Sequence, residues 1–336
     1  MKLLPKLLPP LMLCVLAPGL YAQAPGQPSA VIQITCDYNC LIGYANNYVK
    51  ALGNRDADSA KLAPGVLFSE NDVLMPVGND GLWGTISKVR EGAMTIADEE
   101  TGNAAWFGLV EEHGNPAYLA VRVQVEDGLI TEIESVVNRL PDMPKPFGNP
   151  DTVMHDPVWN DILPEDQRSS RARLVAIADG YFSTVELNDG SIFTLFDDDC
   201  GRLENGVLTT SGNTGLSNGS GGGNAATVAS GCEQQFKLGI YRINKRIRDR
   251  RYPLIDERRG VVMGTGFFDH ANMFDRYTLN DGREMKTVLK WPNSISLLEA
   301  FKVRNGKIWR IEAVFTYVPY FMPSPFAVPN LDFQTR

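Results

Sequence analysis

The sequence has few of the residues and motifs that mark the large enzyme classes. It has no P-loop and no dinucleotide-binding fingerprint, which argues against nucleotide-dependent chemistry. Only three of its 336 residues are histidines, and none stands at ligand spacing to a cysteine, so a zinc site is disfavoured. The net charge of -8 makes nucleic acid an unexpected partner. We expect no cofactor and no metal.

Positive charge is concentrated in one place. The stretch RINKRIRDRRYP, from Arg242 to Pro253, is interrupted by an aspartate, and we interpret it as a solvated helix face or loop. The acidic run from Asp197 to Asp199 lacks the Asp-x-Asp-x-Asp-Gly pattern of a calcium loop. We interpret that run as a solvated turn.

The N-terminal apolar segment, MKLLPKLLPPLMLCVLAPGLYAQAPG, is short and broken by prolines. Lys2 and Lys6 give it a positive start, and small residues suited to cleavage end at Ala24, which together predict a secretory signal peptide over residues 1–24. A spanning helix would need about 20 consecutive apolar residues. We therefore expect an exported protein, extracellular or periplasmic, with no membrane partner.

The cysteines agree with export. Removal of the signal peptide takes Cys14 away and leaves four, and an even count in an oxidising compartment predicts two disulfides. Three pairings are open in principle. The local choice joins Cys36 to Cys40 and Cys200 to Cys232, and the second bridge would clamp a Gly/Ser-rich excursion, TTSGNTGLSNGSGGGNAATVASG.

Two distant stretches resemble each other. LIGYANNYVKALGNRD, from Leu41, and LVAIADGYFSTVELND, from Leu174, share the spacing of a leucine, an alanine, a tyrosine and an acidic residue. Three further pairs of blocks follow in the same order: VLFSEND with TLFDDDC, FGLVEEHG with GTGFFDHA, and EDGLITEIESVV with RNGKIWRIEAVF. The offset grows at the Gly/Ser excursion and again at FDRYTLNDGREMKTVLKWPN. This pattern predicts a tandem duplication.

The duplication sets the expected domain boundaries. Residues 36–139 form the first copy and residues 168–318 the second, with residues 319–336 as a C-terminal tail. Between the copies, residues 140–167 are dense in Pro, Asn and Asp and predict a linker wrapped over the surface.

Each copy begins with helices and continues with strands. Apolar residues at helical spacing place Tyr48 and Tyr181 on the buried face of the first helix of each copy. Long strands rich in Val, Ile, Phe and Trp follow, and hairpin turns are predicted at Asp127-Gly128, Asp281-Gly282 and Asn305-Gly306. This order predicts an α+β fold. The aromatic tail is expected to cover the sheet, with Tyr317 or Tyr320 as alternatives for lining a cavity.

The succession of a helix, an acidic turn after Leu-Phe, and strands ending in N-G-K-I-x-x-I-E resembles the NTF2-like superfamily, which includes SnoaL-like cyclases and ketosteroid isomerase. The resemblance covers both copies, and the pair resembles secreted two-domain proteins of fungi and bacteria. It implies two tandem cone domains, each with N-terminal helices packed on a strongly curved, mainly antiparallel sheet, and a small-molecule site in the cone. Fold alone does not separate enzymes from binding modules.

The isomerase pattern implies a helix tyrosine that donates to a developing oxyanion, a carboxylate base after the Leu-Phe turn, and an acid on a later strand. In the second copy these positions fall on Tyr181, Glu204 and Glu299. Alternation places Glu299 among apolar residues of its strand, so burial would raise its pKa and keep it protonated. The alternative is an edge-strand carboxylate that turns to water. In the first copy the two acid positions fall near the apolar Met75 and Val121, which predicts that this copy has no active site.

His270 is a second candidate base. It ends a predicted strand and follows Asp269, and other NTF2-like lyases use a strand histidine with an acidic partner. The same order recurs at His113, after Glu112, where the neighbouring residues favour a turn motif instead. His155 lies in the linker and is expected to be structural.

These residues predict a secreted, cofactor-independent acid–base enzyme, a lyase, dehydratase or isomerase, that acts in the second copy. A base would remove a proton alpha to a carbonyl or similar group while Tyr181 stabilises the oxyanion. Export favours a small plant- or sugar-derived metabolite as substrate. Glu134 and Glu312 alternate away from the apolar strand face and are expected at exposed or homodimer positions. The alternatives are a non-catalytic binding or assembly protein and a hydrolase whose carboxylates activate water.

Overall fold

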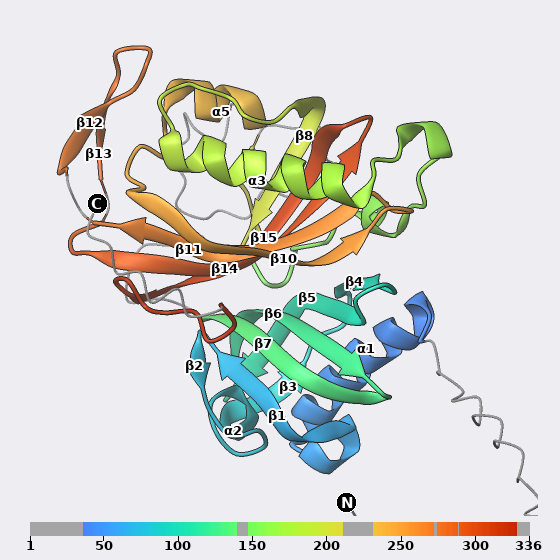
Figure 1. Cartoon of the computed structure of the whole chain (residues 1–336). Coiled ribbons are helices and arrows are strands. Elements are labelled where there is room, and N and C mark those ends of the chain that lie inside the picture. The colour runs from blue at the N-terminus through green and yellow to red at the C-terminus, as the bar shows by residue number, and fades with distance from the viewer. Residues whose placement is uncertain (1–35, 140–146, 211–230, 272–273, 288, 328–336) are drawn as a thin grey trace, which may run out of the picture. The chain divides into compact units, whose positions relative to one another are not determined.

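A computed structural model of the chain describes residues 36–139, 147–210, 231–271, 274–287 and 289–327. The predicted signal peptide and nearly all of the Gly/Ser excursion lie outside these ranges. The described part is an α+β structure with few helices and two large, curved, mixed sheets (Figure 1). No helix within it has the length and apolar character needed to cross a membrane.

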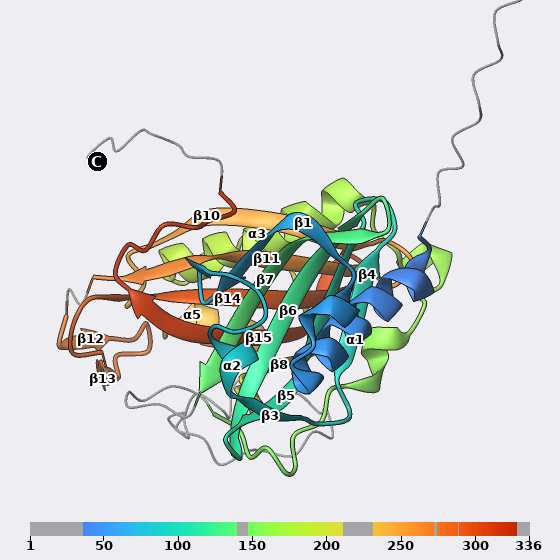
Figure 2. The ribbon, with the colours of Figure 1, turned by 90° about the horizontal axis from the view of Figure 1, so that it is seen from below.

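The first large sheet has the strand order β2-β1-β7-β6-β5-β3, with β4 paired to β5. Helix α1 (Tyr38–Asn54) lies along one of its faces (Figure 2) and begins at Asp37, whose carboxylate accepts a hydrogen bond from the Cys40 backbone N–H. The other elements of this half are η1 (Ala57–Ala60), β1 (Leu62–Glu70), β2 (Val73–Leu74), α2 (Leu82–Thr85), β3 (Ile86–Val89), β4 (Met94–Asp98), β5 (Asn103–Glu112), β6 (Asn115–Glu126) and β7 (Leu129–Arg139).

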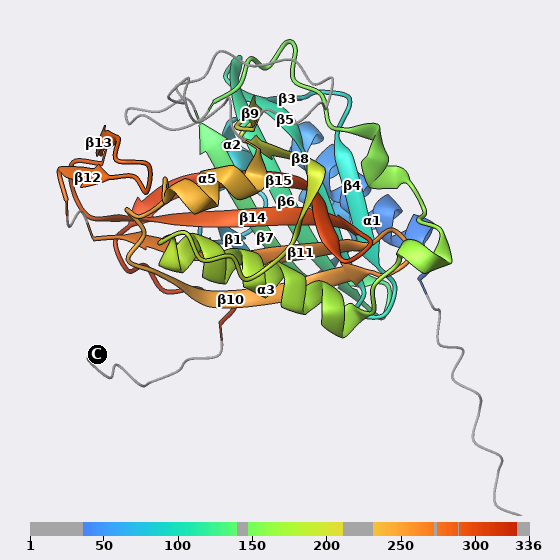
Figure 3. The ribbon, with the colours of Figure 1, turned by 90° about the horizontal axis from the view of Figure 1, so that it is seen from above.

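The second large sheet has the order β10-β11-β14-β15-β8-β9. Helix α3 (Arg171–Leu187), with Ser170 as its N-cap, and the shorter α5 (Cys232–Leu238) lie over one face (Figure 3). The other elements that follow β7 are η2 (Pro157–Asn160), η3 (Glu165–Gln167), β8 (Phe196–Glu204), β9 (Val207–Leu208), β10 (Arg246–Asp256), β11 (Val261–His270), β12 (Arg276–Thr278), β13 (Glu284–Lys286), β14 (Asn293–Arg304) and β15 (Lys307–Pro319). Strands β12 and β13 form a separate hairpin.

The two sheets share one pattern of strand pairing. In each, the first strand after the long helix runs parallel to the last strand, β1 to β7 and β8 to β15, while the other neighbours run antiparallel. An asparagine with positive φ follows each first strand, Asn71 at 49° and Asn205 at 46°. Their Oδ1 atoms accept hydrogen bonds from the last strand, from the Val137 N–H at 2.7 Å and the Phe315 N–H at 2.9 Å. Both asparagines therefore continue the pairing beyond the end of the strand.

Strand register aligns the two sheets residue by residue. Glu70 pairs with Ser135 and Glu204 with Ala313, and these partners hold the same place in the blocks EIESVV and RIEAVF. The counterpart of Glu204 is therefore Glu70, and the expectation of Met75 was wrong. The segment SENDVL corresponds to LENGVL, which comes later in the chain than the block TLFDDDC chosen from the sequence.

The predicted turns at Asp127-Gly128 and Asn305-Gly306 join β6 to β7 and β14 to β15. Both residues of each turn have positive φ, as a two-residue hairpin turn of the primed type requires. Asp281 and Gly282 lie in the turn between β12 and β13. The sequence signal was sufficient here because few residues other than Gly, Asn and Asp adopt this backbone conformation readily.

Within the described residues, buried side chains form three apolar clusters. Two of them fill the space between a sheet and its own helices. The third combines residues of both sheets, such as Phe107 and Met263, with Trp159 of η2. The segment between the halves was expected on the surface, but Trp159 is 2% exposed and Leu163 is also buried. The face of each sheet that no helix covers is thus packed against apolar side chains of the other sheet.

This packing also corrects the expectation that Glu134 and Glu312 are exposed. Both carboxylates are buried. Glu134 Oε2 accepts from Arg122 Nε at 2.9 Å, and its Oε1 accepts from Arg251 of the second sheet. Glu312 contacts the His155 ring, and this carboxylate raises the pKa of the histidine against the effect of its burial. Alternation along the strands correctly placed both glutamates on the sheet face away from the helices. It could not indicate that the other sheet covers that face.

Residues 246–253 of the basic stretch lie on strand β10 and not on a helix or loop, whereas residues 242–245 lie in the irregular segment before the strand. Its arginines are paired, for example Arg248 with Asp269 and Arg250 with Glu186. Aromatic residues of the tail lie over the same strand, with the Phe321 ring centroid 4.7 Å from the Arg248 guanidinium carbon. The strand keeps its many charges because carboxylates and aromatic rings lie beside its arginine side chains.

Both predicted disulfides are confirmed: Cys36–Cys40 and Cys200–Cys232. The second bridge joins β8 to α5 across 32 residues, whereas the first spans only 4. Replacing Cys200 and Cys232 by serine is expected to lower the free energy of unfolding by about 4 kcal/mol, against about 2 kcal/mol for Cys36 and Cys40, because a longer closed loop restricts the unfolded chain more. Urea unfolding of the two double variants measures both losses. A larger loss for the short bridge would contradict this prediction.

Candidate functional site

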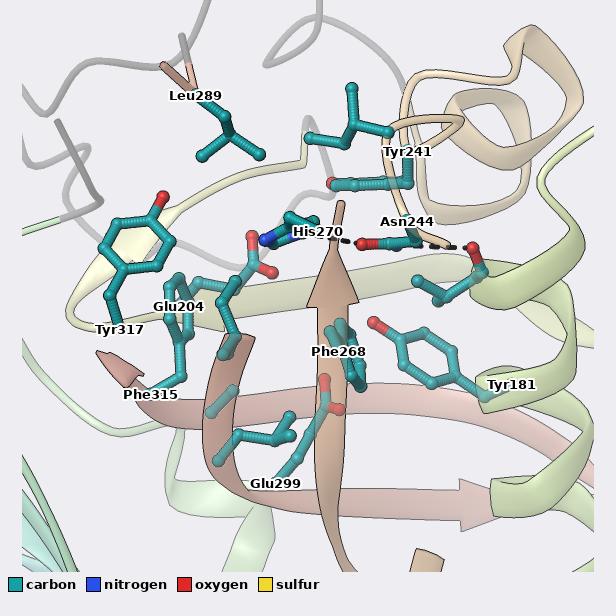
Figure 4. Close-up of a pocket in the computed structure, with 15 residues that line it drawn as sticks. Tyr181, Glu204, Tyr241, Asn244, Phe268, His270, Leu289, Glu299, Phe315 and Tyr317 are labelled. Carbon is teal, nitrogen blue, oxygen red and sulfur yellow. Dashed lines mark hydrogen bonds between the residues drawn. The ribbon is translucent and has the colours of Figure 1, made fainter. Parts of the chain in front are cut away.

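A cavity of about 170 Å³ lies between α3 and the second sheet (Figure 4). Most of its wall is aromatic or aliphatic. The described lining residues are Tyr181, Val185, Glu204, Tyr241, Ile243, Asn244, Phe268, His270, Leu289, Ile295, Leu297, Glu299, Ala313, Phe315 and Tyr317. Four of the five residues proposed from the sequence as catalytic therefore meet here, namely Tyr181, Glu204, His270 and Glu299.

Tyr181 extends from the buried face of α3 into the cavity (Figure 4). Its ring packs edge-on against Phe236 and Phe301, at centroid distances of 5.4 and 4.9 Å. Burial, and then the charge of Glu299, raise the pKa of Tyr181 well above its ordinary value. The hydroxyl consequently keeps its proton and can donate a hydrogen bond.

Glu299 lies on β14 and is 2% exposed. Burial, followed by the negative charge of Glu204, raises its pKa to about 8, although Arg202 and a hydrogen bond with Tyr181 act in the opposite direction. The group is therefore protonated at neutral pH. Its Oε2 has no hydrogen-bond partner among the described residues. This confirms the buried alternative from the sequence over a carboxylate that turns to water.

Glu204, the last residue of β8, lies beside a buried arginine that the sequence analysis missed. Glu204 Oε2 is 3.4 Å from Arg202 Nε, and the Glu204 side chain keeps 17% of its surface exposed. Two residues along a strand point to the same side, so alternation around Glu204 could have pointed to Arg202. Arg202 lies in a run of charged residues, and such runs are commonly solvated, so the sequence did not indicate that this arginine is buried.

His270 ends β11 and is held by two asparagines. Its Nδ1 lies 3.0 Å from Asn293 Oδ1, and its Nε2 lies 2.7 Å from Asn244 Oδ1 (Figure 4). Burial lowers the pKa of His270, and the smaller effects of Asn293 and Asp269 do not offset it. Both partner atoms are amide oxygens, which only accept, so the neutral ring donates from one nitrogen and the other nitrogen also faces an amide oxygen. The ring therefore has to turn before a ring nitrogen can accept a proton from a ligand.

Asp269 does not line the cavity. Its carboxylate accepts from Ser294 Oγ at 2.6 Å and from Arg248 Nε at 3.0 Å. Successive residues of a strand point to opposite faces, so Asp269 and its neighbour His270 could not both face the cavity. The pairing of Asp269 with His270 expected from the sequence is replaced by the two asparagines.

In the first half, the side chains at the positions that correspond to these cavity-lining residues pair with one another. Arg139 Nη2 lies 2.8 Å from Glu70 Oε1, and Arg139 Nε contacts Glu112. By strand register Glu70, Glu112 and Arg139 stand where Glu204, His270 and Tyr317 stand in the second half. Three polar positions that face a cavity in one half thus form an ion-pair cluster in the other.

Large side chains complete the closure of the first half. Trp83 Nε1 donates to the Tyr48 hydroxyl at 3.2 Å, and both residues are buried. Val121 occupies the place of Glu299, as the sequence predicted. His113 lies in the hairpin turn between β5 and β6 with a φ of 48°, in agreement with the turn interpretation. Tyr48 is therefore a core residue with a satisfied hydroxyl.

Of the two tyrosines predicted as alternatives for lining a cavity, Tyr317 lines it, whereas Tyr320 is exposed. Burial raises the pKa of Tyr317 to about 12. Within the described residues no group of three or more His, Cys, Asp or Glu side chains is arranged to hold a metal ion.

Residues 167–315 match the model of a protein family described as a domain of unknown function, DUF8021. This match covers the second half and less than half of the whole chain. No curated protein sequence matches the chain.

Several solved structures are similar to parts of the chain, and they include the following three. A protein from Sphaerobacter thermophilus is 20% identical and covers 30% of this chain and 96% of its own, with a TM-score of 0.19. AclR, a candidate hydroxylase from Streptomyces galilaeus, is 15% identical over 31% and 89%, with a TM-score of 0.20. An NTF2-like protein of unknown function from Cytophaga hutchinsonii is 14% identical over 44% and 100%, with a TM-score of 0.22.

Proposed function

We propose that the second half is a cofactor-independent acid–base enzyme, a lyase, dehydratase or isomerase, that acts on a small molecule in the cavity between α3 and the second sheet. The observation that carries the proposal is Glu299. It is a protonated carboxylic acid at neutral pH, its Oε2 has no partner among the described residues, and it lies beside Tyr181. Two neutral donors side by side in a buried apolar site suit an oxygen that gains negative charge during a reaction.

The base in this proposal is Glu204. Its carboxylate takes the proton from a carbon next to a carbonyl or similar group, and the C–H electron pair moves into the substrate to give an oxyanion. Tyr181 and Glu299 donate hydrogen bonds to that oxygen. Glu204 then returns the proton to another carbon, which is an isomerisation, or to a departing hydroxyl, which is a dehydration. Glu204 is preferred to His270 because both ring nitrogens of His270 are engaged.

The lining favours an uncharged substrate with an apolar body. Among the described lining residues there is no lysine or arginine to bind an anionic group. Phe268, Phe315 and the tyrosines offer flat apolar surface, which stabilises planar or ring-containing molecules. A plant- or sugar-derived metabolite that carries an apolar ring and a carbonyl group meets these requirements.

We also propose that both halves are NTF2-like copies of one ancestral domain and that the protein is exported. The shared strand pairing, the paired asparagines and the matching register support the duplication. Two disulfides support an oxidising compartment. In this proposal the first copy has lost its cavity to ion pairing and the second has kept it.

The test begins with a thermal-shift screen of uncharged carbonyl compounds, followed by product analysis of each ligand found. Glu204→Gln is expected to lower turnover by about a hundredfold or more, which is the usual contribution of a general base. Turnover of the unaltered protein is expected to fall as pH rises through about 8, because Glu299 then loses its proton.

Glu70→Gln is the matched control, since Glu70 has the same place in the sheet of the first half. It is expected to change stability while the chemical step stays nearly intact. Full turnover in Glu204→Gln would refute the assignment of the base. Ligands that bind tightly without any product, in every compound class tried, would favour a binding protein instead.

A further inference from the structure

Arg202 is a buried cation behind the wall of the cavity. It lies on β8, and the side chains of Cys200, Arg202 and Glu204 point to the same side of the strand. Arg202 is 1% exposed. A charge removed from water in this way is costly unless each of its donors has a partner.

Those partners surround the guanidinium group. Arg202 Nε donates to Thr209 Oγ1 at 3.0 Å and lies 3.4 Å from Glu204 Oε2. Its Nη2 donates to Gln235 Oε1 and to the Tyr241 hydroxyl. Tyr241 and Glu204 line the cavity, so Arg202 connects two of its walls from behind.

Helix α5 keeps this arrangement in place. Cys232, Gln235 and Phe236 lie three and four residues apart, hence on one face of the helix, and this face meets β8. Cys232 is bonded to Cys200, Gln235 accepts from Arg202, and the Phe236 ring centroid is 5.5 Å from the Arg202 guanidinium carbon. Three different interactions thus join one helix to one strand around the arginine.

The first half has no cation at this place. Arg202 pairs with Ile311 and Phe68 pairs with Ile133, and the two isoleucines hold the same position in the repeated block, so Phe68 is the counterpart of Arg202. Phe68 belongs to the apolar cluster of the first half. A buried arginine at this strand position therefore occurs in the second half, which has the cavity. The first half, whose polar side chains at the corresponding cavity positions pair with one another, has a phenylalanine there.

We propose that Arg202 is a positioning residue, which fixes the Glu204 carboxylate and the Tyr241 hydroxyl in the cavity wall that also contains Glu299. The proposal rests on the proposed function, since it makes Arg202 the residue that positions Glu204, the base of that same site. Arg202 does not contact the substrate. Its guanidinium holds the Glu204 carboxylate from behind, whereas Glu299 Oε2 has no hydrogen-bond partner among the described residues.

The electrostatics agree with this geometry. Burial alone would lower the pKa of Arg202, but its acidic neighbours, Glu204 first among them, raise it, so the guanidinium stays charged. Conversely, Arg202 lowers the pKa of Glu299, which burial and Glu204 raise, and the balance is about 8. Loss of the arginine charge removes that lowering, and the Glu299 pKa is then expected to increase.

The experiment follows the side-chain carboxyl signals of ¹³C-labelled glutamate by NMR as the pH is raised, without any ligand. Glu299→Gln identifies the signal that titrates near pH 8. In Arg202→Met this midpoint is expected to rise by about one pH unit or more, which is the scale for a neighbouring charge. Arg202→Lys, which keeps the charge, is expected to stay closer to the unaltered protein.

Arg310→Met is the matched control, because Arg310 is a buried arginine paired with Asp156 away from the cavity. It is expected to leave the midpoint unchanged. If Arg202→Met does not fold, Gln235→Met, which weakens the hold on Arg202, takes its place. An unchanged midpoint in Arg202→Met, or in Gln235→Met where it takes its place, would overturn the proposal.

The outcomes separate this proposal from the proposed function. A shifted titration midpoint of Glu299 with no turnover of any compound would support the positioning role of Arg202 and count against the proposed enzymatic activity. Turnover whose pH profile is the same in Arg202→Met would support the enzyme and eliminate the positioning role.

Discussion

Replacement of Glu134 by glutamine is expected to lower the free energy of unfolding by about 3–5 kcal/mol, the usual loss when one partner of a buried ion pair is removed. Glu134 lies between Arg122 of the first sheet and Arg251 of the second. Without the carboxylate, Arg122 is left as a buried cation with less compensation. Chemical unfolding at neutral pH, with the disulfides intact, measures this loss.

Glu132→Gln is the matched control. Glu132 contacts the same Arg122, at 2.8 Å, but its side chain is 35% exposed, so water compensates for the change and a loss of about 1 kcal/mol or less is expected. Despite burial, the two arginines hold the pKa of Glu134 below its ordinary value of 4.5. The contribution of Glu134 is therefore present above pH 4.5 and disappears as the pH falls through its folded-state pKa. Equal losses for the two variants would show that the sheets do not depend on this pair.

Trp159→Ala is expected to lower the free energy of unfolding by about 3–5 kcal/mol, the range for removal of a buried tryptophan. Trp159 belongs to the apolar cluster that contains residues of both sheets, and its removal leaves a cavity there. Thermal or urea unfolding measures the loss. Trp291→Ala is the control, since Trp291 is 54% exposed and its removal is expected to change stability little. Similar losses in the two variants would contradict the role of Trp159 in joining the sheets.

The features that sequence reasoning predicted well depend on local chemistry. An even count of cysteines, turns that require positive φ, and a tyrosine on a helix stripe can each be recognised without knowledge of contacts between distant segments. They placed Tyr181 and both disulfides correctly. The burial of Glu299 was predicted correctly because it alternates with apolar residues along its strand, and such residues share the face of the sheet that the core covers.

The errors concern contacts between segments far apart in the chain. Nothing local indicates that a second sheet covers Glu134, or that Asn244 and not Asp269 accompanies His270. The counterpart of Glu204 was misplaced because a short acidic block matched by chance, whereas strand register depends on every pair along the ladder. Arg202 was missed for a related reason, because its partners Gln235 and Tyr241 come from later segments.

The parallel pairing of first and last strands has a consequence for folding kinetics. The contact between Asn71 and Val137 closes a loop of 66 residues, and that between Asn205 and Phe315 closes one of 110. Closing long loops costs chain entropy before the contacts stabilise the product, so non-local pairing of this kind folds slowly. The second half cannot complete its sheet until β15 is available, and its open strand edges are exposed to aggregation until then. The Cys200–Cys232 bridge spans 32 residues, most of them within the loop between Asn205 and Phe315, so its formation before the sheet would shorten that loop.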